Sequence, residues 1–267
     1  MKKMYKKISL WEDSVSLRHH PRLEGVADCE VLVLGGGMAG ILIASKLAEE
    51  GIDVAVVDAG RIGHGVTAGT TAKITSQHGL IYQKLVNDIG LENAGLYLEA
   101  NEAAIQEYAR ICEAGEETCG FHRTANYIYS LRGQKVLEAE MAALEQIGCK
   151  SARFRSGTSL TLPFENDGAV EFPLQAGFHP LKFLKKITES DHLKNTDFFE
   201  NSRITALKRW QDGGWEAVSE HGSILADQVV IASHFPFIDR RGMYFIKMHQ
   251  NRSLVIAGTV KADESEK

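Results

Sequence analysis

The sequence lacks any long apolar run. No stretch approaches the roughly 18 consecutive apolar residues that a membrane-spanning helix needs. The basic start, residues 1–7, is not followed by the apolar core of a signal peptide, because Glu12, Asp13 and Arg18 interrupt it. We therefore expect a cytoplasmic protein without a membrane partner.

Cysteine is scarce, and positive charge is not in excess. The four cysteines form no Cys-x-x-Cys motif and no Cys-x-His pair, which argues against a metal or iron–sulfur site and favours buried, reduced thiols. They are Cys29, Cys112, Cys119 and Cys149. The formal net charge is −5, so the composition gives no sign of a nucleic-acid partner.

The sequence does contain a strand–helix–strand pattern near its start. Glu30 to Leu34 is a short apolar run rich in β-branched residues, which is typical of a buried parallel strand. Residues 39–47 carry apolar groups at helical spacing, and Gly51 ends that helix. Val54 to Val57 is a second buried strand, and Asp58 follows it directly. This order is typical of a βαβ unit.

A glycine motif joins the first strand to the helix. Gly35 allows a tight turn, Gly37 removes a side chain where a pyrophosphate must approach the backbone, and Gly40 lets the helix pack closely. The helix then directs its N–H groups and positive dipole end at the phosphates. Asp58 can accept hydrogen bonds from a ribose. The alternative is a glycine-rich turn without a ligand. The predicted cofactor contacts here are Gly35, Gly37, Met38, Ala39, Gly40, Asp58 and Ala59.

The segment after Asp58 favours FAD over NAD. A nicotinamide enzyme usually continues with a third strand and helix, whereas residues 60–79 form a loop rich in glycine and threonine. Small residues and hydroxyls suit a backbone that lies along a pyrophosphate and a ring. A cation such as Lys73, with amide N–H groups, would stabilise the anionic reduced flavin.

The rest of the chain alternates helical and extended patterns. Helices are expected over residues 91–113, 134–147 and 180–187, and strands at 127–131 and within 153–177. Further strands at 204–210, 215–219 and 229–232 form a meander, and the last of them is buried enough to rejoin the first sheet.

The expected fold class is α/β. A Rossmann-type FAD-binding domain, with a parallel sheet and a β-meander, is interleaved with a smaller α+β substrate domain that is incomplete. The expected ranges are an N-terminal arm at 1–28, the first part of the FAD domain at 29–84, the substrate domain at 85–184, the second part of the FAD domain at 185–240, and a returning strand of the substrate domain at 241–267.

Three segments carry a family resemblance. GGGMAG, VVDAGRIGHGVTAGTTAK and ADQVVIAS resemble the D-amino-acid oxidase/glycine oxidase superfamily of FAD-dependent oxidoreductases. The match covers residues 29–78 well and 180–235 moderately. SLWEDS and TTAKITSQHG are similar to a bacterial subgroup that often carries a C-terminal Rieske domain. The resemblance implies that this chain is the N-terminal part of a longer protein, with a redox partner or a further C-terminal region.

The resemblance also implies cofactor contacts beyond the glycine motif. Arg61 would lie by the adenosine or pyrophosphate, Gly65, Val66 and Thr67 by the pyrophosphate, and Thr71, Ala72 and Lys73 near the isoalloxazine. The backbone of Ile204 would touch the adenine, and Ala232 and Ser233 would approach the cofactor. One departure concerns the late strand, which usually ends in glycine; here His234 places a bulky ring at that point.

The family removes hydride from a carbon that bears an amine. Lys73 is the candidate for tuning the flavin, and His78 is the candidate for proton transfer; solvated loop residues are the alternative for both. A substrate carboxylate would favour an arginine. Tyr127 and Tyr129 share a strand face and are expected in the core. The candidate arginines, among which the sequence does not choose, are Arg123, Arg132, Arg153 and Arg155.

These observations favour an FAD-dependent oxidoreductase that acts on a small amine or amino acid. The first alternative is a non-catalytic FAD- or nucleotide-binding module, or an inactive fragment of a longer flavoenzyme. The second is an NAD-dependent dehydrogenase. Ser253 to Val260 is expected to be a strand of the smaller domain, so we expect the chain alone to hold FAD weakly.

Overall fold

The structure is a computed structural model of the 267-residue chain. It describes residues 8–115, 119–131, 133–160, 162, 164–210, 213–235, 237, 242–249, 251 and 253. The chain forms two compact units, of which unit 1 contains residues 1–71 and 180–257, and unit 2 contains residues 72–179 and 258–267. The expected strand at Ser253–Val260 lies almost wholly outside the described residues, as does Arg132.

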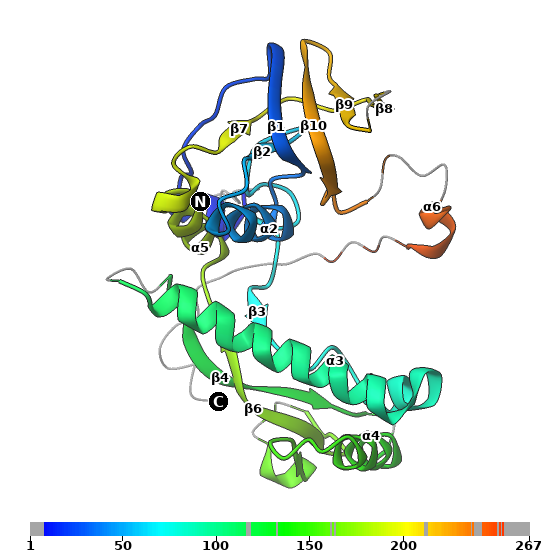
Figure 1. Ribbon diagram of the computed structural model, residues 1–267. Helices are drawn as coiled ribbons and strands as arrows, with labels where there is room; N and C mark the ends of the chain where they lie inside the picture. The colour runs from blue at the N-terminus through cyan, green and yellow to red at the C-terminus, as the bar shows by residue number, and fades with distance from the viewer. Residues whose placement is uncertain are drawn as a thin grey trace, which may run out of the picture. The chain divides into compact units, whose positions relative to one another are not determined.

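Unit 1 is built on a six-stranded sheet in the order β7-β2-β1-β10-β9-β8 (Figure 1). Strand β1 is parallel to β2 on one side and to β10 on the other, and β2 is parallel to β7. Strands β10, β9 and β8 are antiparallel and form the expected meander. The bounds are β1 Gly25–Leu34, β2 Val54–Val57, β7 Asp197–Phe199, β8 Ala206–Arg209, β9 Trp215–Val218 and β10 Gly222–Ile231.

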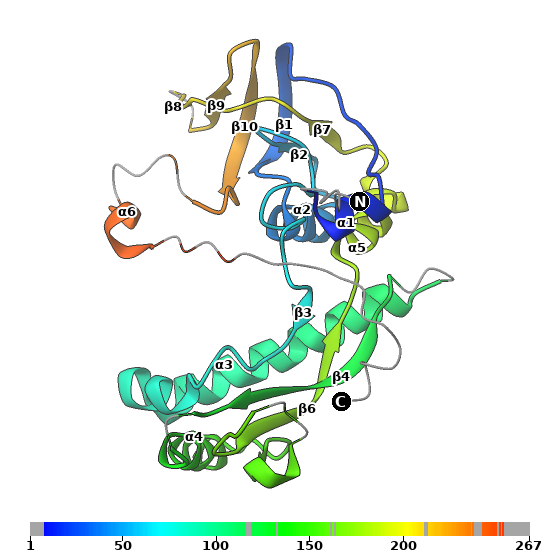
Figure 2. The same cartoon turned by 180° about the vertical axis from the view of Figure 1, so that it is seen from behind.

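Two helices pack side by side in unit 1 (Figures 1 and 2). Helix α2, Met38–Glu49, follows the glycine turn. Helix α5, Pro180–Thr188, begins at a proline, which the first turn tolerates because an N–H there would have no partner within the helix. The short helix α1, Leu10–Ser14, is capped by Ser9 and packs against α5. The remaining short elements are the 3-10 helix η2, Asp191–Leu193, and α6, Tyr244–Lys247.

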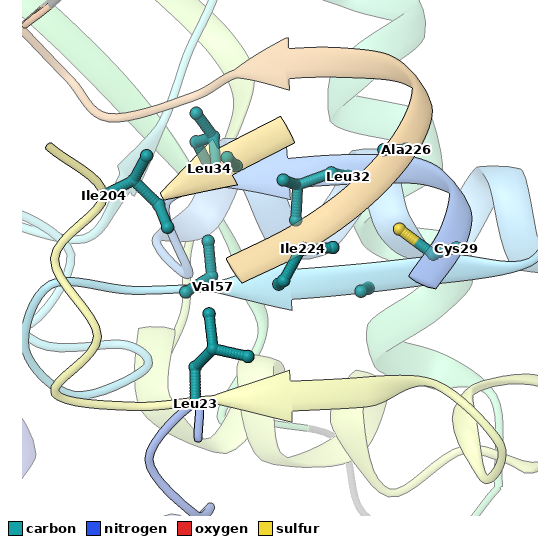
Figure 3. Close-up of a cluster of buried hydrophobic side chains, with 10 residues drawn as sticks. Leu23, Cys29, Leu32, Leu34, Val57, Ile204, Ile224 and Ala226 are labelled. Atoms are coloured by element: carbon teal, nitrogen blue, oxygen red, sulfur yellow. The ribbon is translucent and has the colours of Figure 1, made fainter. Parts of the chain in front are cut away.

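The core of unit 1 gathers apolar side chains from β1, β2, β9 and β10 (Figure 3). Leu32, Val57 and Ile224 point toward one another there, and Leu23 and Ile204 close the cluster. Removal of this apolar surface from water stabilises the sheet. Cys29 lies at the edge of the cluster, and burial raises the pKa of its thiol to about 12.

Unit 2 contains an antiparallel sheet in the order β3-β6-β4, with β5 also paired to β6. Helices α3 and α4 pack on it, because Val170 and Phe172 of β6 lie in one buried cluster with Tyr82, Leu98 and Leu137. Gly90 interrupts the helical geometry of α3, with φ of 82°. The bounds are β3 Lys73–Ile74, α3 Tyr82–Glu113, β4 His122–Tyr129, α4 Lys135–Gln146, β5 Arg153–Arg155, η1 Gly157–Ser159 and β6 Ala169–Gly177.

Two tyrosines of β4 do not lie in the core, and that expectation is wrong. Tyr127 and Tyr129 share a strand face as predicted, but each is 45% exposed. They pair with Glu171 and Ala169 of β6, whereas the neighbouring residues Val170 and Phe172 face the helices. Alternation along a strand fixes which residues share a face but does not identify the buried one.

The two units divide the chain at different points from the ranges expected from the sequence. Residues 72–84 belong to unit 2, because Lys73 and Ile74 pair with β6 as strand β3. Residues 180–184 belong to unit 1, because α5 packs against α2. Residues 8–28 also belong to unit 1, and they include α1 and the first part of β1.

Candidate functional site

The glycine turn after β1 is the candidate cofactor site, and each of its glycines meets a close neighbour. A Cβ on Gly40 would lie 1.8 Å from the carbonyl oxygen of Gly35, so the first turn of α2 needs a residue without a side chain there. Gly35 has φ of +113°, a value that strains other residues. A Cβ on Gly35 would lie 2.6 Å from the carbonyl oxygen of Ala232, where β10 ends. The turn is therefore compressed between β10 and α2.

The N-terminus of α2 meets the hydroxyl of Thr67. Met38 N–H donates to Thr67 Oγ1 over 3.0 Å, and a Cβ on Gly37 would lie 3.3 Å from the same oxygen. Thr67 is buried, whereas Gly37 and Met38 are half-buried and Ala39 is exposed. The first N–H groups of a helix have no partner within the helix and carry its positive dipole end. This end of α2 thus presents donors and a hydroxyl to an anion.

Asp58 connects three segments of unit 1, two through its carboxylate and one through its backbone. Oδ2 accepts the N–H of Gly36 over 2.7 Å, and Oδ1 accepts the N–H of Gly60 over 2.7 Å. Asp58 also follows β2 directly, and its backbone N–H donates to Phe199 of β7. The residue is half-buried, and a carboxylate can accept more than two hydrogen bonds, so Asp58 can organise the turn and still accept from a ribose.

Arg61 lies beside a buried carboxylate that the sequence reading missed. Glu200 is 1% exposed, and its Oε1 accepts the N–H of Ile62 over 3.0 Å. Arg61 Nε lies 3.8 Å from Glu200 Oε2, and this buried Nε has no hydrogen-bond partner among the described residues. The backbone N–H of His20 also donates to Oε2 over 3.4 Å. Glu200 therefore joins the N-terminal arm to the segment after β2. The sequence could have indicated this residue only as a single acid directly after β7.

Burial shapes the chemistry of His20. The pKa of His20 lies below its ordinary value, because its burial disfavours the charged ring more than the nearby Glu200 favours it. Its ring packs against Phe198 at 4.8 Å between centroids. His20 is therefore a packed ring beside Glu200 whose neutral form is favoured by burial.

The other predicted cofactor contacts of unit 1 differ in how exposed they are. Gly65 and Val66 are exposed, with Val66 at 61%. Ile204 is 7% exposed and lies in the core, so only its backbone could reach a ligand. The N–H of Ala232 donates to Leu34 over 2.8 Å. These contacts place Ala232 against β1, with Ser233 next to it. Ala59 and Thr71 are exposed and complete the set.

The two catalytic candidates and Ala72 belong to unit 2. Ala72 is buried in a left-handed conformation with φ of 57°, directly before Lys73. Lys73 is exposed and starts β3, where it pairs with Gly177. His78 is exposed, and its Nδ1 lies 2.8 Å from the hydroxyl of Tyr97. The structure thus fixes the ring of His78 from one side.

Among the candidate arginines, the structure distinguishes Arg155. Its Nε donates to Glu171 over 2.6 Å, and the Tyr127 hydroxyl donates to the same carboxylate over 2.9 Å. The Arg155 hydrogen bond holds the pKa of Glu171 below its ordinary value, and the Glu171 hydrogen bond raises the pKa of Tyr127. Arg123 lies over Phe121 and donates to Leu174, and Arg153 is exposed on β5.

Two kinds of feature are absent from the described part of the chain. No group of three or more histidine, cysteine, aspartate or glutamate residues there could hold a metal ion. No described helix is both long and apolar enough to cross a membrane.

Sequence comparison with known proteins identifies relatives. The profile of the family described as FAD dependent oxidoreductase matches residues 30–235. A Bacillus subtilis (strain 168) protein that bears the name of a Rieske 2Fe-2S iron-sulfur protein, YhfW, is 31% identical over 96% of this chain and 50% of its own length. The gamma-glutamylputrescine oxidoreductase of Escherichia coli (strain K12) is 22% identical over 77% of this chain and 49% of its own length. The chain spans about half the length of both relatives.

Solved structures share the fold. The L-amino acid deaminase from Proteus myxofaciens, in complex with anthranilate, superposes with a TM-score of 0.59 over 92% of this chain and 53% of its own, at 14% identity. The glycine oxidase from Geobacillus kaustophilus gives a TM-score of 0.57 over 78% of this chain and 55% of its own, at 17% identity. At these identities the likeness shows a common fold, and the expected α/β fold class is confirmed.

Proposed function

Because this chain belongs to the FAD dependent oxidoreductase family, we propose that its glycine turn binds FAD and that the protein oxidises the C–N bond of a small amine or amino acid. The observation that carries the proposal is the arrangement at the start of α2. There the compressed glycine turn, the Thr67 hydroxyl and the Asp58 carboxylate meet within hydrogen-bonding distance of the backbone.

The residues present fit a dinucleotide. A Cβ at Gly37 would lie 3.3 Å from Thr67 Oγ1, so a side chain there would compete with a pyrophosphate that approaches the backbone. The pyrophosphate would lie along the backbone from Gly35 to Gly40, close to Gly65 and Thr67. Asp58 would accept from the ribose hydroxyls. Arg61, whose buried Nε has no hydrogen-bond partner among the described residues, would direct its guanidinium toward the adenosine or pyrophosphate.

The chain's own residues would bind and orient the reactants. FAD, when bound, accepts the hydride that leaves the substrate carbon. The Lys73 ammonium would supply positive charge near the isoalloxazine. His78, whose ring nitrogen is hydrogen-bonded to the Tyr97 hydroxyl, would receive a proton from the substrate amine. A substrate carboxylate would favour one of the candidate arginines.

The names of the relatives support an amine substrate. They refer to gamma-glutamylputrescine, to L-amino acids and to glycine, all of which carry an amine nitrogen. The Rieske protein YhfW supports a further proposal, that an iron–sulfur partner or region takes electrons from the reduced cofactor. That partner belongs to the whole protein and is tested separately, by reduction of an iron–sulfur centre after substrate is added.

An anaerobic titration tests the proposal. The purified chain should bind FAD in an equilibrium titration, and in excess FAD a panel of amines and amino acids should include compounds that bleach the bound flavin. Bound flavin without bleaching by any compound would favour a non-catalytic module. Absence of flavin binding together with binding of NAD would favour a dehydrogenase.

A further inference from the structure

A short N-terminal segment fastens the loop that carries Thr67. This segment is residues 9–14, which comprise Ser9 and helix α1, and we call it the clasp. The loop is residues 64–70, which follow β2 and end just before unit 2 begins at Ala72. Both belong to unit 1. The clasp lies about sixty positions away from the loop in sequence, so their contacts arise from the tertiary fold and not from proximity along the chain.

Three side chains of the clasp reach the loop. The Ser9 hydroxyl donates to the carbonyl oxygen of Ala68, and the same hydroxyl accepts the N–H of Trp11 to cap α1. Trp11 Nε1 donates to the carbonyl oxygen of Thr70 over 2.9 Å. Glu12 Oε1 lies 3.4 Å from His64 Nε2. Capping of α1 and attachment of the loop therefore depend on the same hydroxyl.

The attachment points bracket Thr67. His64, Ala68 and Thr70 lie on either side of it, and the loop also bonds to itself, because the N–H of Gly69 donates to Gly65 over 3.0 Å. Thr67 is the residue whose hydroxyl accepts from Met38 at the start of α2. The chain of contacts thus runs from the clasp through the loop to the glycine turn.

We propose that the clasp is a positioning element that holds the 64–70 loop against the glycine turn and thereby slows the release of FAD. The proposal rests on the proposed function for its ligand, but the attachment itself is a property of the protein without FAD. A loop held in its binding conformation loses less conformational freedom when the ligand binds. Release of the clasp should therefore weaken binding without a change in any atom that touches the cofactor.

Trp11→Phe isolates one of the three contacts. The substitution keeps an aromatic ring and removes the indole N–H that donates to Thr70. The matched control is Trp210→Phe, the same chemical change at a tryptophan that is 45% exposed after β8. Glu12→Gln provides a second variant, because it removes the charge beside His64 and keeps the size of the side chain.

The experiment has two readouts on the full 267-residue chain. The first is amide hydrogen exchange without FAD, in which Trp11→Phe should speed exchange at Gly69 and Met38 and leave the core strand residue Val56 unchanged. The second is the rate of FAD release, which Trp11→Phe should raise about fivefold, the effect of one ordinary hydrogen bond. Trp210→Phe should change neither.

Each result decides a separate point. Unchanged exchange at Gly69 and Met38 in both Trp11→Phe and Glu12→Gln would overturn the attachment. Faster exchange with an unchanged rate of FAD release would overturn the link to the cofactor. A wild-type chain that binds no FAD would overturn the proposed function and that link together, while the exchange data would still decide whether the clasp holds the loop.

Discussion

At the scale of single residues, Asp58 shows how one side chain can serve a fold and a ligand together. Its two oxygens accept the N–H groups of Gly36 and Gly60, which belong to the turns that follow β1 and β2. Both turns lie at the carboxyl ends of parallel strands, the edge where such sheets bind ligands. An acid at this point therefore stabilises the site before any ligand arrives.

Asp58→Asn should destabilise the protein without FAD as well as weaken FAD binding. One of the two N–H groups would then face an amide NH₂ instead of an oxygen, at a cost of about 1–3 kcal/mol in the free energy of unfolding. Urea unfolding of the apoprotein and a titration with FAD measure the two effects. The control is Asp53→Asn, at an exposed residue just before β2. Wild-type stability with reduced FAD affinity would show that Asp58 serves only the ligand.

Gly37→Ala should weaken FAD binding at least about tenfold, equal to 1.4 kcal/mol, while the fold is kept. Gly37 has φ of −79°, which alanine adopts without strain, but the added Cβ would lie 3.3 Å from Thr67 Oγ1. Equilibrium binding of FAD gives the affinity, and circular dichroism reports the fold. Gly95→Ala is the matched control, because the nearest atom to its Cβ would be 3.9 Å away in the middle of α3. An equal loss of FAD affinity in both variants would show that the glycine turn is not part of the binding site.

At the scale of elements, the sheet of unit 2 is held by a charged cluster on its exposed face. Glu171 of β6 accepts from Arg155 of β5 and from Tyr127 of β4, so one carboxylate bonds to side chains from two neighbouring strands. Glu171 is 5% exposed, whereas Tyr127 is 45% exposed. The cluster therefore joins three strands at the boundary between protein and water.

Glu171→Gln should lower the free energy of unfolding by about 1 kcal/mol at pH 7, a value reduced for the solvent exposure of the partners. The pKa of Glu171 is depressed in the folded protein, mainly by Arg155. Its contribution is therefore fully present above the ordinary glutamate pKa and is lost as pH falls through the lower folded value. Unfolding measured from pH 7 to pH 3 should show the wild type converging on the variant. The exposed Glu165→Gln is the control, and parallel wild-type and Glu171→Gln curves would contradict the prediction.

The elements that could be predicted from sequence are those with a repeated signal. The buried run before Gly35 identified β1, although the strand begins five residues earlier than expected, at Gly25, where most residues are not buried. Helices α2, α4 and α5 lie within a residue or two of their expected bounds, because apolar spacing and end residues agree. Strand β7 was missed, because three residues are too few to show a period.

The candidate site was predictable only where a motif constrains the backbone. The structure brings together the glycine turn and Asp58, both of which were singled out by a motif, and their roles in binding stay predictions. Glu200 was not predictable, because its partners His20 and Ile62 come from segments far from it in sequence. The attachment of Trp11 to Thr70 has the same origin. Long-range polar contacts of this kind leave no periodic trace in a single sequence.

At the scale of the whole molecule, unit 2 is almost a continuous insertion into unit 1. Its described residues run from Ala72 to His179, and they contain their own buried cluster around Tyr82 and Phe172. Unit 1, in contrast, takes β1 and β2 from before the insertion and β7 to β10 from after it. The described strands of unit 2 therefore come from one continuous segment, whereas in unit 1 some neighbouring strands lie on opposite sides of the insertion.

A separately expressed segment of residues 72–179 should fold cooperatively. Its sheet, its two helices and their cluster are all local to it, and a segment of this size is within the usual range for a domain. Urea unfolding followed by circular dichroism and by tyrosine fluorescence should give coincident transitions. Leu144→Ala, at a fully buried position of α4, should lower the midpoint, whereas Leu131→Ala, at an exposed one, should not. A segment without a cooperative transition would mean that unit 2 depends on unit 1.

The pairing of β1 with β10 has a consequence for synthesis. Roughly 190 residues separate the two strands, yet they are parallel neighbours in the centre of one sheet. A ribosome adds about 5–20 residues each second, so β1 waits on the order of 10–40 s for its partner. During that time the edge of β1 is open to incorrect pairing, while the whole of unit 2 emerges and can fold. We expect the nascent chain to need a chaperone until β10 has left the ribosome.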